Sequence, residues 1–408
     1  MAALLSILLV PYLAWLGWAA LRHPVPLSYN WRSLWQRKVG TLSTAGAIAV
    51  VVAIFVVVLS LSKGLSLAFV SSGRADQALV LRPNSRTELG STVDRDQARI
   101  LRTHPLVAED EFGPLASAEC FVVSMLDLAD GSGGTNVAVR GLSPAGIRMR
   151  SQVHLVAGRW FQPGLPELVL PRRMLGRFEG LQLGRRLKLF GREFAIVGVF
   201  DGGGSAFDSE IWMDVDQLMQ VKKRNVYSSM LVRLRSAAQV EGFIRMADDD
   251  KRLKLEALRE SEYFAQQTAA GKPIQVLGYL ITVILTVGAV FAAMNTMYGA
   301  VAGRTAEIGM LRAMGFRRTE ILASFQWEAL MLCALGGLAG ACLALAFDGI
   351  QTGTTNFETF SDIRFAFVIT PGLMAEGVAF SLLMGMLGGF PPAWRASRMP
   401  ITEAMKGG

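Results

Sequence analysis

The chain has 408 residues, of which 51% are hydrophobic and only 18% carry a charge. A soluble domain averages about 25% charged residues, so this composition indicates membrane-spanning segments and excludes an intrinsically disordered chain. Three cysteines are too few for a disulfide-rich scaffold. The net charge of +8 suits either nucleic acid or an acidic membrane surface, and the positions of the charges decide between them.

Residues 1–27 form an apolar N-terminal stretch that contains Pro11, Tyr12, Trp15 and Trp18. Three interpretations are open: a cleaved signal peptide, an additional membrane span, or a helix in the membrane interface. The stretch lacks a basic start and a small-x-small cleavage site, which argues against a signal peptide. We favour an uncleaved additional span whose N-terminus lies outside the cytoplasm.

Four further stretches are long and apolar enough to cross a bilayer, which takes about 20 residues in a helix. Charge inside them is sparse, and the exceptions are Glu328 and Glu376. Glu328 lies near the cytoplasmic end of its span, where we expect it to reach the interface or pair with an arginine. The predicted spans are residues 39–61, 274–301, 321–347 and 367–390.

The charges beside these spans predict their orientation, because Lys and Arg in short loops stay in the cytoplasm. Three segments are basic: 28–38, the loop 302–320 and the tail 391–408. The loop 348–366 is acidic and is predicted to face the other way, as a short periplasmic loop. Residues 62–273 then also lie outside the cytoplasm, as a large periplasmic domain of a multi-pass protein in a bacterial inner membrane.

The segment 62–273 carries 29 basic and 25 acidic residues, mixed along its length. No basic run with interleaved aromatic residues appears, so nucleic acid is excluded as a partner. Short β-branched runs and helical spacings predict an α+β domain. The expected strands are 193–200, 211–215 and 227–234, and the expected helices are 237–246 and 253–267, the second leading as a stalk into the next span.

The sequence lacks the motifs of the common catalytic sites. No phosphate-binding loop with a Gly-Lys-Ser/Thr ending is present. His23, His104 and His154 are scattered without metal-ligand spacing, and Cys333 and Cys342 lie within a span. We therefore predict that the chain is not an enzyme and has no catalytic, cofactor-binding or metal-binding residues of its own.

The loop between the second and third predicted spans is the most informative short segment. Its apolar residues Ile308, Leu311 and Met314 recur at helical spacing, and Gly315 suits a helix end. This pattern fits a short amphipathic helix on the cytoplasmic face. An ordinary basic surface loop fits the pattern equally well.

The loop resembles the coupling helix of the FtsX/MacB-type permeases of ABC transporters, whose pattern is roughly R-x-x-E-I-G-x-L-R-A-x-G. Segments 31–42, 326–340 and 392–404 resemble the family's membrane part, and segments 158–161, 191–198 and 204–212 resemble the MacB-like periplasmic core. The resemblance runs from Ser28 to the end, and residues 1–27 depart from the usual four-span plan. The residues that match the coupling pattern are Arg304, Glu307, Ile308, Gly309, Leu311, Arg312, Ala313 and Gly315.

The resemblance implies a polytopic α-helical membrane protein, with four core transmembrane helices and an extra N-terminal helix, and a large inserted α+β periplasmic domain. It implies a permease subunit that pairs with a second permease, as a homodimer or a heterodimer. Two copies of a separate ABC ATPase would bind ATP and Mg, because this sequence contains no ATP-binding motif. In this interpretation Arg304 and Arg312 face acidic groups of the ATPase, and Glu307 faces a basic group.

The function implied is mechanotransmission, in which ATP hydrolysis moves the periplasmic domain to export or extract periplasmic or outer-leaflet cargo. A membrane-fusion adaptor and an outer-membrane channel are further partners of such exporters. The alternative is an FtsX-like signalling scaffold that regulates a periplasmic cell-wall hydrolase without transport. Two pairs of glycines predict close helix packing, either at a dimer seam or within one subunit: Gly336 and Gly340, and Gly385 and Gly389.

Overall fold

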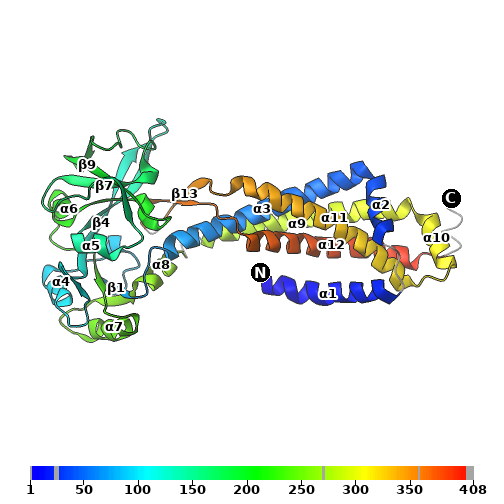
Figure 1. The fold of residues 1–408 in the computed structure, drawn as a ribbon, viewed down its shortest axis with the longest axis horizontal. Coiled ribbons are helices and arrows are strands. Elements are labelled where there is room, and N and C mark those ends of the chain that lie inside the picture. Colours follow the sequence, from blue (N-terminus) through cyan, green and yellow to red (C-terminus); the bar gives the residue numbers. More distant parts are fainter. Residues whose placement is uncertain (1, 23–26, 269–271, 357–358, 401–408) are drawn as a thin grey trace. The chain divides into compact units, whose positions relative to one another are not determined.

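A computed structural model describes residues 2–22, 27–268, 272–356 and 359–400 and shows two compact units (Figure 1). The helical unit comprises residues 1–62, 273–350 and 367–408. The α+β unit comprises residues 63–272 together with residues 351–366. This architecture confirms the predicted fold class of a polytopic helical protein with an inserted α+β domain.

The helical unit contains four helices in the described chain that are long and apolar enough to cross a membrane. Their apolar faces pack together around α3, where the Phe55 ring stacks on Phe380 at 4.3 Å between centroids. Several helices extend beyond the predicted spans, because helix propensity continues past the apolar core: α3 ends at Val70, whereas residue 61 was the predicted end. The long helices are α3 (Lys38–Val70), α9 (Lys272–Ala302), α11 (Arg318–Ala344) and α12 (Pro371–Arg398).

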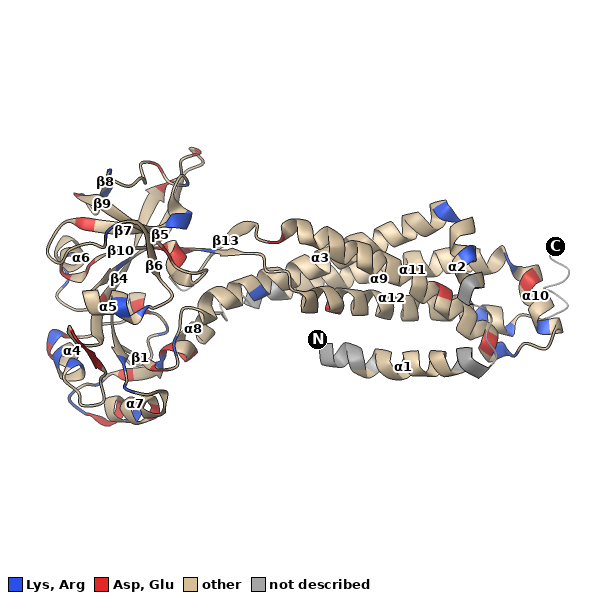
Figure 2. Ribbon diagram, viewed as in Figure 1, with Lys and Arg blue, Asp and Glu red and all other residues tan. Residues whose placement is uncertain are grey.

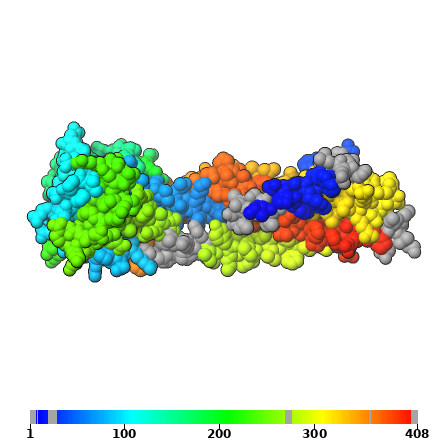
Figure 3. Space-filling view, turned by 90° about the horizontal axis from the view of Figure 1, so that it is seen from below, coloured from blue at the N-terminus to red at the C-terminus, as the bar shows by residue number. Residues whose placement is uncertain are grey.

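Three shorter helices complete this unit. Helix α1 (Ala2–Arg22) packs against α11 and α12, and its Leu16 is fully buried beside Ala323 and Leu330. Figure 3 shows α1 in dark blue on the surface of the unit, beside α12 in red. Helix α2 (Leu27–Gln36) precedes α3, and helix α10 (Thr305–Ala313) lies between α9 and α11.

The α+β unit is built on one mixed sheet with strand order β12-β1-β11-β4-β5-β10-β7-β9-β6, to which β8 adds beside β9. The long strand β4 joins two apolar cores: Ala116 belongs to one, and Cys120, Val122 and Leu126 belong to the other. The strands are β1 (Gln77–Leu81), β4 (Ala116–Asp127), β5 (Gly134–Leu142), β6 (His154–Gly158), β7 (Glu167–Pro171), β8 (Arg186–Leu189), β9 (Arg192–Asp201), β10 (Glu210–Asp214), β11 (Ser229–Arg233) and β12 (Glu256–Arg259).

Helices and a short hairpin flank this sheet. Strands β2 (Glu109–Asp110) and β3 (Gly113–Pro114) pair only with each other. The helices are α4 (Arg95–Arg102), α5 (Pro144–Met149), α6 (Val215–Lys222), α7 (Val240–Asp249) and α8 (Glu260–Thr268). The strands predicted near residues 193–200, 211–215 and 227–234 are present as β9, β10 and β11.

The predicted helix 253–267 is wrong in its first half. Residues 256–259 form β12, which pairs antiparallel with β1, and only residues 260–268 are helical. Leu255 and Ala257 are buried on one side of this strand. A segment this short fits both the 3.6-residue spacing of a helix and the two-residue alternation of a strand. Pairing with β1 at the edge of the sheet makes it a strand.

Residues 348–366, expected as a short loop, contain an ordered hairpin. Strands β13 (Gln351–Thr355) and β14 (Asp362–Ala366) pair along their whole length. The hairpin belongs to the α+β unit, where the Arg364 amide donates to Ser209 Oγ at 2.8 Å and Asp362 pairs with Arg177. These contacts join segments about 150 residues apart in sequence, which a reading of local sequence cannot detect.

The position of α1 generates a first prediction. In a variant without native cysteines, Ala2→Cys should react with a membrane-impermeant maleimide in spheroplasts, because an additional span places residue 2 outside. A cysteine at Met314 on the cytoplasmic side should react only after lysis. Reaction of Ala2→Cys only after lysis contradicts the additional span.

Candidate coupling site and a buried charge cluster

Five polar side chains meet where α10 connects α9 to α11; we call Tyr29, Ser33, Arg304, Glu307 and Glu328 the Arg304 cluster. Arg304 Nη1 donates to Glu328 Oε2 and to Ser33 Oγ, each at 2.9 Å. Ser33 Oγ donates to Glu328 Oε1 at 3.0 Å, and Arg304 Nε donates to Glu307 Oε2 at 2.9 Å. The cluster therefore ties α2, α10 and α11 together through one guanidinium group.

Burial makes these bonds strong. Arg304 is 9% exposed and Glu328 is 2% exposed, so each charge depends on the other for the solvation it has lost. The Arg304 guanidinium also lies 4.6 Å from the centre of the Tyr29 ring and 5.4 Å from that of Phe325. The Tyr29 hydroxyl donates to Glu307 and, with Arg304, holds the pKa of that carboxyl below its usual value.

Helix α10 is fixed from its buried side and ended by glycine. Ile308 is 1% exposed and packs into a core with Met297 and Phe325. Gly315 has φ +97°, the left-handed conformation that closes a helix, and the Phe316 amide bonds back to the Leu311 carbonyl at 3.1 Å. The helix predicted from the amphipathic pattern is therefore formed.

The exposed side of α10 is apolar. Met310 is 54% exposed and Met314 is 69% exposed, and Ala306 and Ala313 are exposed beside them. These four residues lie outside the four candidate spans. A contiguous apolar patch of flexible methionines outside the membrane core is typical of a protein-binding surface. We call Ala306, Met310, Ala313 and Met314 the methionine face.

The structure changes the expectation for the charged residues of this helix. Arg304 was expected to face an acidic partner, but its guanidinium is occupied by Glu328, Ser33 and Glu307. Glu307 was expected to face a basic partner group, and it is bonded to Tyr29 and Arg304 of its own chain. Arg312 and Leu311 are partly buried, and Gly309 is buried. Arg304 and Glu307 tie the helix into the unit, and the methionine face is exposed together with the half-exposed Glu307 side chain.

The four predicted packing glycines lie at contacts between helices of this chain. A Cβ on Gly336 or Gly340 would lie 2.8 Å and 2.4 Å from the carbonyl oxygens of Ala45 and Ala49 on α3. A Cβ on Gly389 would lie 2.4 Å from Ala329 Cβ on α11, and one on Gly385 would lie 3.0 Å from Cys333. The small residues thus allow α11 to approach α3 and α12 to approach α11 within one subunit.

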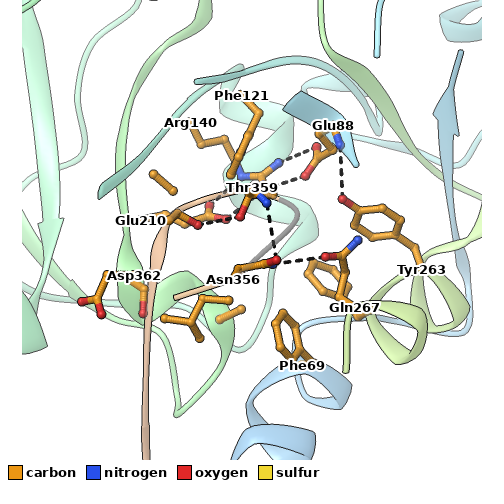
Figure 4. Close-up of a pocket in the computed structure, with 16 residues that line it drawn as sticks. Phe69, Glu88, Phe121, Arg140, Glu210, Tyr263, Gln267, Asn356, Thr359 and Asp362 are labelled. Atoms are coloured by element: carbon orange, nitrogen blue, oxygen red, sulfur yellow. Dashed lines mark hydrogen bonds and ion pairs between the residues drawn. The ribbon is translucent and has the colours of Figure 1, made fainter. Parts of the chain in front are cut away.

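The α+β unit holds a buried charge cluster that the sequence analysis missed (Figure 4). Arg140 is 2% exposed and forms ion pairs of 2.6–2.8 Å with Glu88, Glu119 and Glu210. Arg150 forms a second bond to Glu119 at 2.7 Å. The two guanidinium groups face more carboxylates than they can neutralise.

Strand register brings these residues together. Arg140 on β5 lies opposite Phe121 on β4 and Trp212 on β10, and Glu119 and Glu210 precede those partners by two residues. Side chains two residues apart share one face of a strand, so all lie on one side of the sheet. The only sequence signal is a charged residue inside an apolar strand run, such as the arginine of VAVRGL.

Glu260 adds a further carboxyl close to this cluster. It is 2% exposed and accepts a hydrogen bond from the Arg74 amide at 2.9 Å. Burial raises the pKa of Glu260 to about 7, against the opposing effect of Arg150. A pocket lined by Glu88, Arg140 and Glu210 adjoins the charge cluster, and Asn356, which follows β13, reaches it and donates from Nδ2 to Gln267 Oε1 at 3.3 Å (Figure 4).

The Arg304–Glu328 pair generates a stability prediction. Glu328→Leu should destabilise the protein by about 3–5 kcal/mol, because it removes the buried partner of Arg304 and leaves only the half-exposed Glu307 to pair with it. The double variant Arg304→Met with Glu328→Leu should recover most of this loss. Thermal unfolding in detergent measures both, and a double variant less stable than the single variant would contradict a charge-pairing role.

Glu260 generates a pH prediction. The Glu260 carboxyl ionises near pH 4.5 in the unfolded protein and at about pH 7 in the folded protein. Raising the pH between these values therefore favours unfolding. Glu260→Gln cannot ionise, so its unfolding temperature should rise relative to the parent protein from about pH 5 to about pH 8. A difference between the two proteins that does not change with pH would show that Glu260 is ionised when folded.

Comparison with known proteins agrees with this architecture. Residues 41–248 match the family model of the MacB-like periplasmic core domain, and residues 279–401 match that of the FtsX-like permease C-terminal. The chain is 26% identical over 296 residues to the macrolide export ATP-binding/permease protein MacB of Bdellovibrio bacteriovorus, covering 66% of this chain and 44% of that protein. It is 37% identical over 128 residues to the pyoverdine export ATP-binding/permease protein PvdT of Pseudomonas fluorescens, covering 31% of this chain and 18% of that protein.

The crystal structure of the periplasmic region of MacB from Actinobacillus actinomycetemcomitans matches 47% of this chain and 92% of that one, with a TM-score of 0.36 and 10% identity. The chain spans less than half of the length of the curated relatives described above. The periplasmic core match covers half of the chain and adjoins a permease match in the membrane part. The chain therefore belongs to the FtsX/MacB-type permease family and is a multi-pass inner-membrane protein with a large periplasmic domain.

Proposed function

We propose that this chain is the membrane-spanning subunit of an ABC transporter that moves its periplasmic domain by mechanotransmission to export or extract cargo. The methionine face on α10 is the observation that carries the proposal. It is apolar, exposed and outside the candidate spans, and the Arg304 cluster holds it against the ends of α2 and α11. A rigidly held apolar helix face is what an ATPase needs in order to push on the membrane helices.

The docking chemistry follows from the residues that are exposed. Met310 and Met314 supply flexible apolar side chains that adapt to a groove, and Glu307 and Arg312 lie at the margins. Movement of α10 then acts on α11 and α2 through Arg304, since the guanidinium bonds to both Glu328 and Ser33. The ATP and Mg belong to the partner ATPase, of which two copies would serve a pair of permease subunits.

Chain continuity provides the route for the motion. Helix α3 is a single helix from Lys38 to Val70, and the chain passes from the helical unit to the α+β unit within it, at residue 63. The β13–β14 hairpin is a second route, because it follows α11, precedes α12 and belongs to the α+β unit. A stiff helix and a paired hairpin carry displacement without any path for cargo through the membrane.

The names of the relatives favour export over signalling. The matched proteins are described as exporters of macrolides and of pyoverdine. We propose a membrane-fusion adaptor and an outer-membrane channel as further partners of this exporter. Cargo in the periplasm or the outer leaflet reaches the α+β unit without crossing the inner membrane.

The methionine face generates the test of this function. Met310→Glu with Met314→Glu should abolish the stimulation of ATP hydrolysis by the permease, because two charges cannot enter an apolar groove without losing their hydration. The assay uses the full chain in nanodiscs together with the proposed partner ABC ATPase. The basal activity of the ATPase alone should be unchanged.

Met310→Leu with Met314→Leu is the matched control and should keep the stimulation, because leucine preserves the apolar surface. Unfolding temperatures of both double variants should equal that of the parent protein, since the replaced side chains are exposed. Full stimulation by the Glu variant would remove the methionine face from the proposed coupling.

A further inference from the structure

The α+β unit contains an open groove of about 440 Å³ that the coupling mechanism does not use. Its walls come from α4, the β2–β3 hairpin, β4 and the starts of α5 and α6. A volume of this size falls within the range of about 300–1,000 Å³ of sites for small organic ligands. The groove lies entirely within one unit, so its shape does not depend on how the two units are arranged.

One wall of the groove is a row of arginines. Arg95, Arg99 and Arg102 are spaced by four and then three residues, which places them on one face of α4. Leu101, on another side of the helix, is buried in an apolar core, and Ala98, which also lines the groove, is buried as well, so packing fixes the arginine face. Figure 2 shows these basic residues on α4 and further charge on α5.

The charges at this wall are only partly neutralised. Arg99 pairs with Asp96 at 3.0 Å, where both side chains are exposed. Arg95 and Arg102 form no ion pair with any residue that the structure describes, and Asp216 is the acid that lines the groove with them. Two guanidinium groups, each with a fork of donors suited to an oxyanion, therefore point at one cavity without partners.

The remaining lining is apolar and aromatic. The Phe112 ring is 70% exposed, and the Arg148 guanidinium lies 5.0 Å from its centre. Ala116, Ala118 and Met230 form an apolar floor between the arginines and α5. Desolvation and the Asp216 carboxylate raise the pKa of Tyr227, while Arg95 and Arg102 oppose the rise, so two positive charges and one negative charge lie within range of its hydroxyl. That hydroxyl has no hydrogen-bond partner in the described part of the chain.

These observations describe an amphipathic ligand. An inorganic anion alone would leave the aromatic and apolar walls unused, and a neutral apolar molecule would leave the arginines without partners. We propose that this groove binds a small organic anion, a carboxylate, sulfonate or phosphate attached to an aromatic ring or a short hydrocarbon. The anionic group lies between Arg95 and Arg102 and accepts from Tyr227, and the apolar part rests on Phe112.

Binding is measured on the full chain in nanodiscs by fluorine NMR, with para-trifluoromethylbenzenesulfonate as the probe and empty nanodiscs as the reference. The probe signal should broaden saturably, and its affinity should fall with added salt. The corresponding neutral sulfonamide should not bind. Arg95→Gln with Arg102→Gln should weaken sulfonate binding by about tenfold or more, since bonds to charged groups are lost.

Arg172→Gln with Arg185→Gln is the matched control, because it removes the same charge from exposed positions of this unit that do not line the groove. It should leave the affinity unchanged. Phe112→Ala should weaken the sulfonate while leaving any binding of inorganic sulfate as it is. All substituted side chains are exposed, so unfolding temperatures should stay equal and loss of binding cannot be mistaken for misfolding.

Several results would overturn the proposal: equal binding by the Arg95→Gln/Arg102→Gln variant, equal binding of the neutral sulfonamide, or no saturable binding. Binding of an acidic Glu-rich peptide in place of the sulfonate would assign the groove to a protein partner and also overturn it. The measurement needs no ATPase. A negative result therefore leaves the proposed transporter function untouched, and a failed coupling assay leaves the groove untouched.

Discussion

The Arg304–Glu328 ion pair sets the conformation of the cytoplasmic end of this protein. Both side chains are buried, so removal of Arg304 leaves Glu328 without its cation, and removal of Glu328 leaves Arg304 only the half-exposed Glu307. Because the same guanidinium bonds to Ser33 and Glu307, the pair fixes α2 and α10 as well as α11. The apolar side of α10 that remains exposed follows from this arrangement: the polar residues of the loop are used to hold the helix, and Met310 and Met314 are left outside.

The α+β unit relies on the same kind of constraint at its centre. Arg140 is surrounded by three carboxylates from different strands and a short helix, and each bond specifies the relative position of two elements. We expect such a cluster to contribute to the uniqueness of the packing more than to its stability, since an apolar core of equal volume would cost less desolvation. Glu260 lies beside this cluster, where the carboxyl groups outnumber the arginines. Burial raises the pKa of Glu260, and the two arginines do not offset this rise.

The chain links the membrane helices to the α+β unit through two continuous segments, and that unit also contains the groove proposed as a ligand site. Helix α3 is a membrane helix whose last part, from residue 63, belongs to the α+β unit. The β13–β14 hairpin belongs to that unit as a whole and connects the membrane helices α11 and α12. The arginine-lined groove belongs to the α+β unit, and the methionine face belongs to the helical unit, so the two surfaces are built from different parts of the chain. The proposed ATPase contact and the proposed anion site thus use separate surfaces, each with its own chemistry.

The sequence by itself predicted the spans, the orientation and the family, and for α10 it left a helix and a loop equally open until the family resemblance favoured the helix. These depend on local quantities: apolar run length, the sign of flanking charge, and the spacing of Ile308, Leu311 and Gly315. The tertiary structure alone decided that Arg304 is an internal tie, that residues 256–259 are a strand, and that residues 351–366 join the α+β unit. Each of these depends on a partner far away in the chain, such as Glu328, β1 or Ser209. Local patterns report which side of a segment is apolar, but only folding brings a charge to the partner that neutralises it.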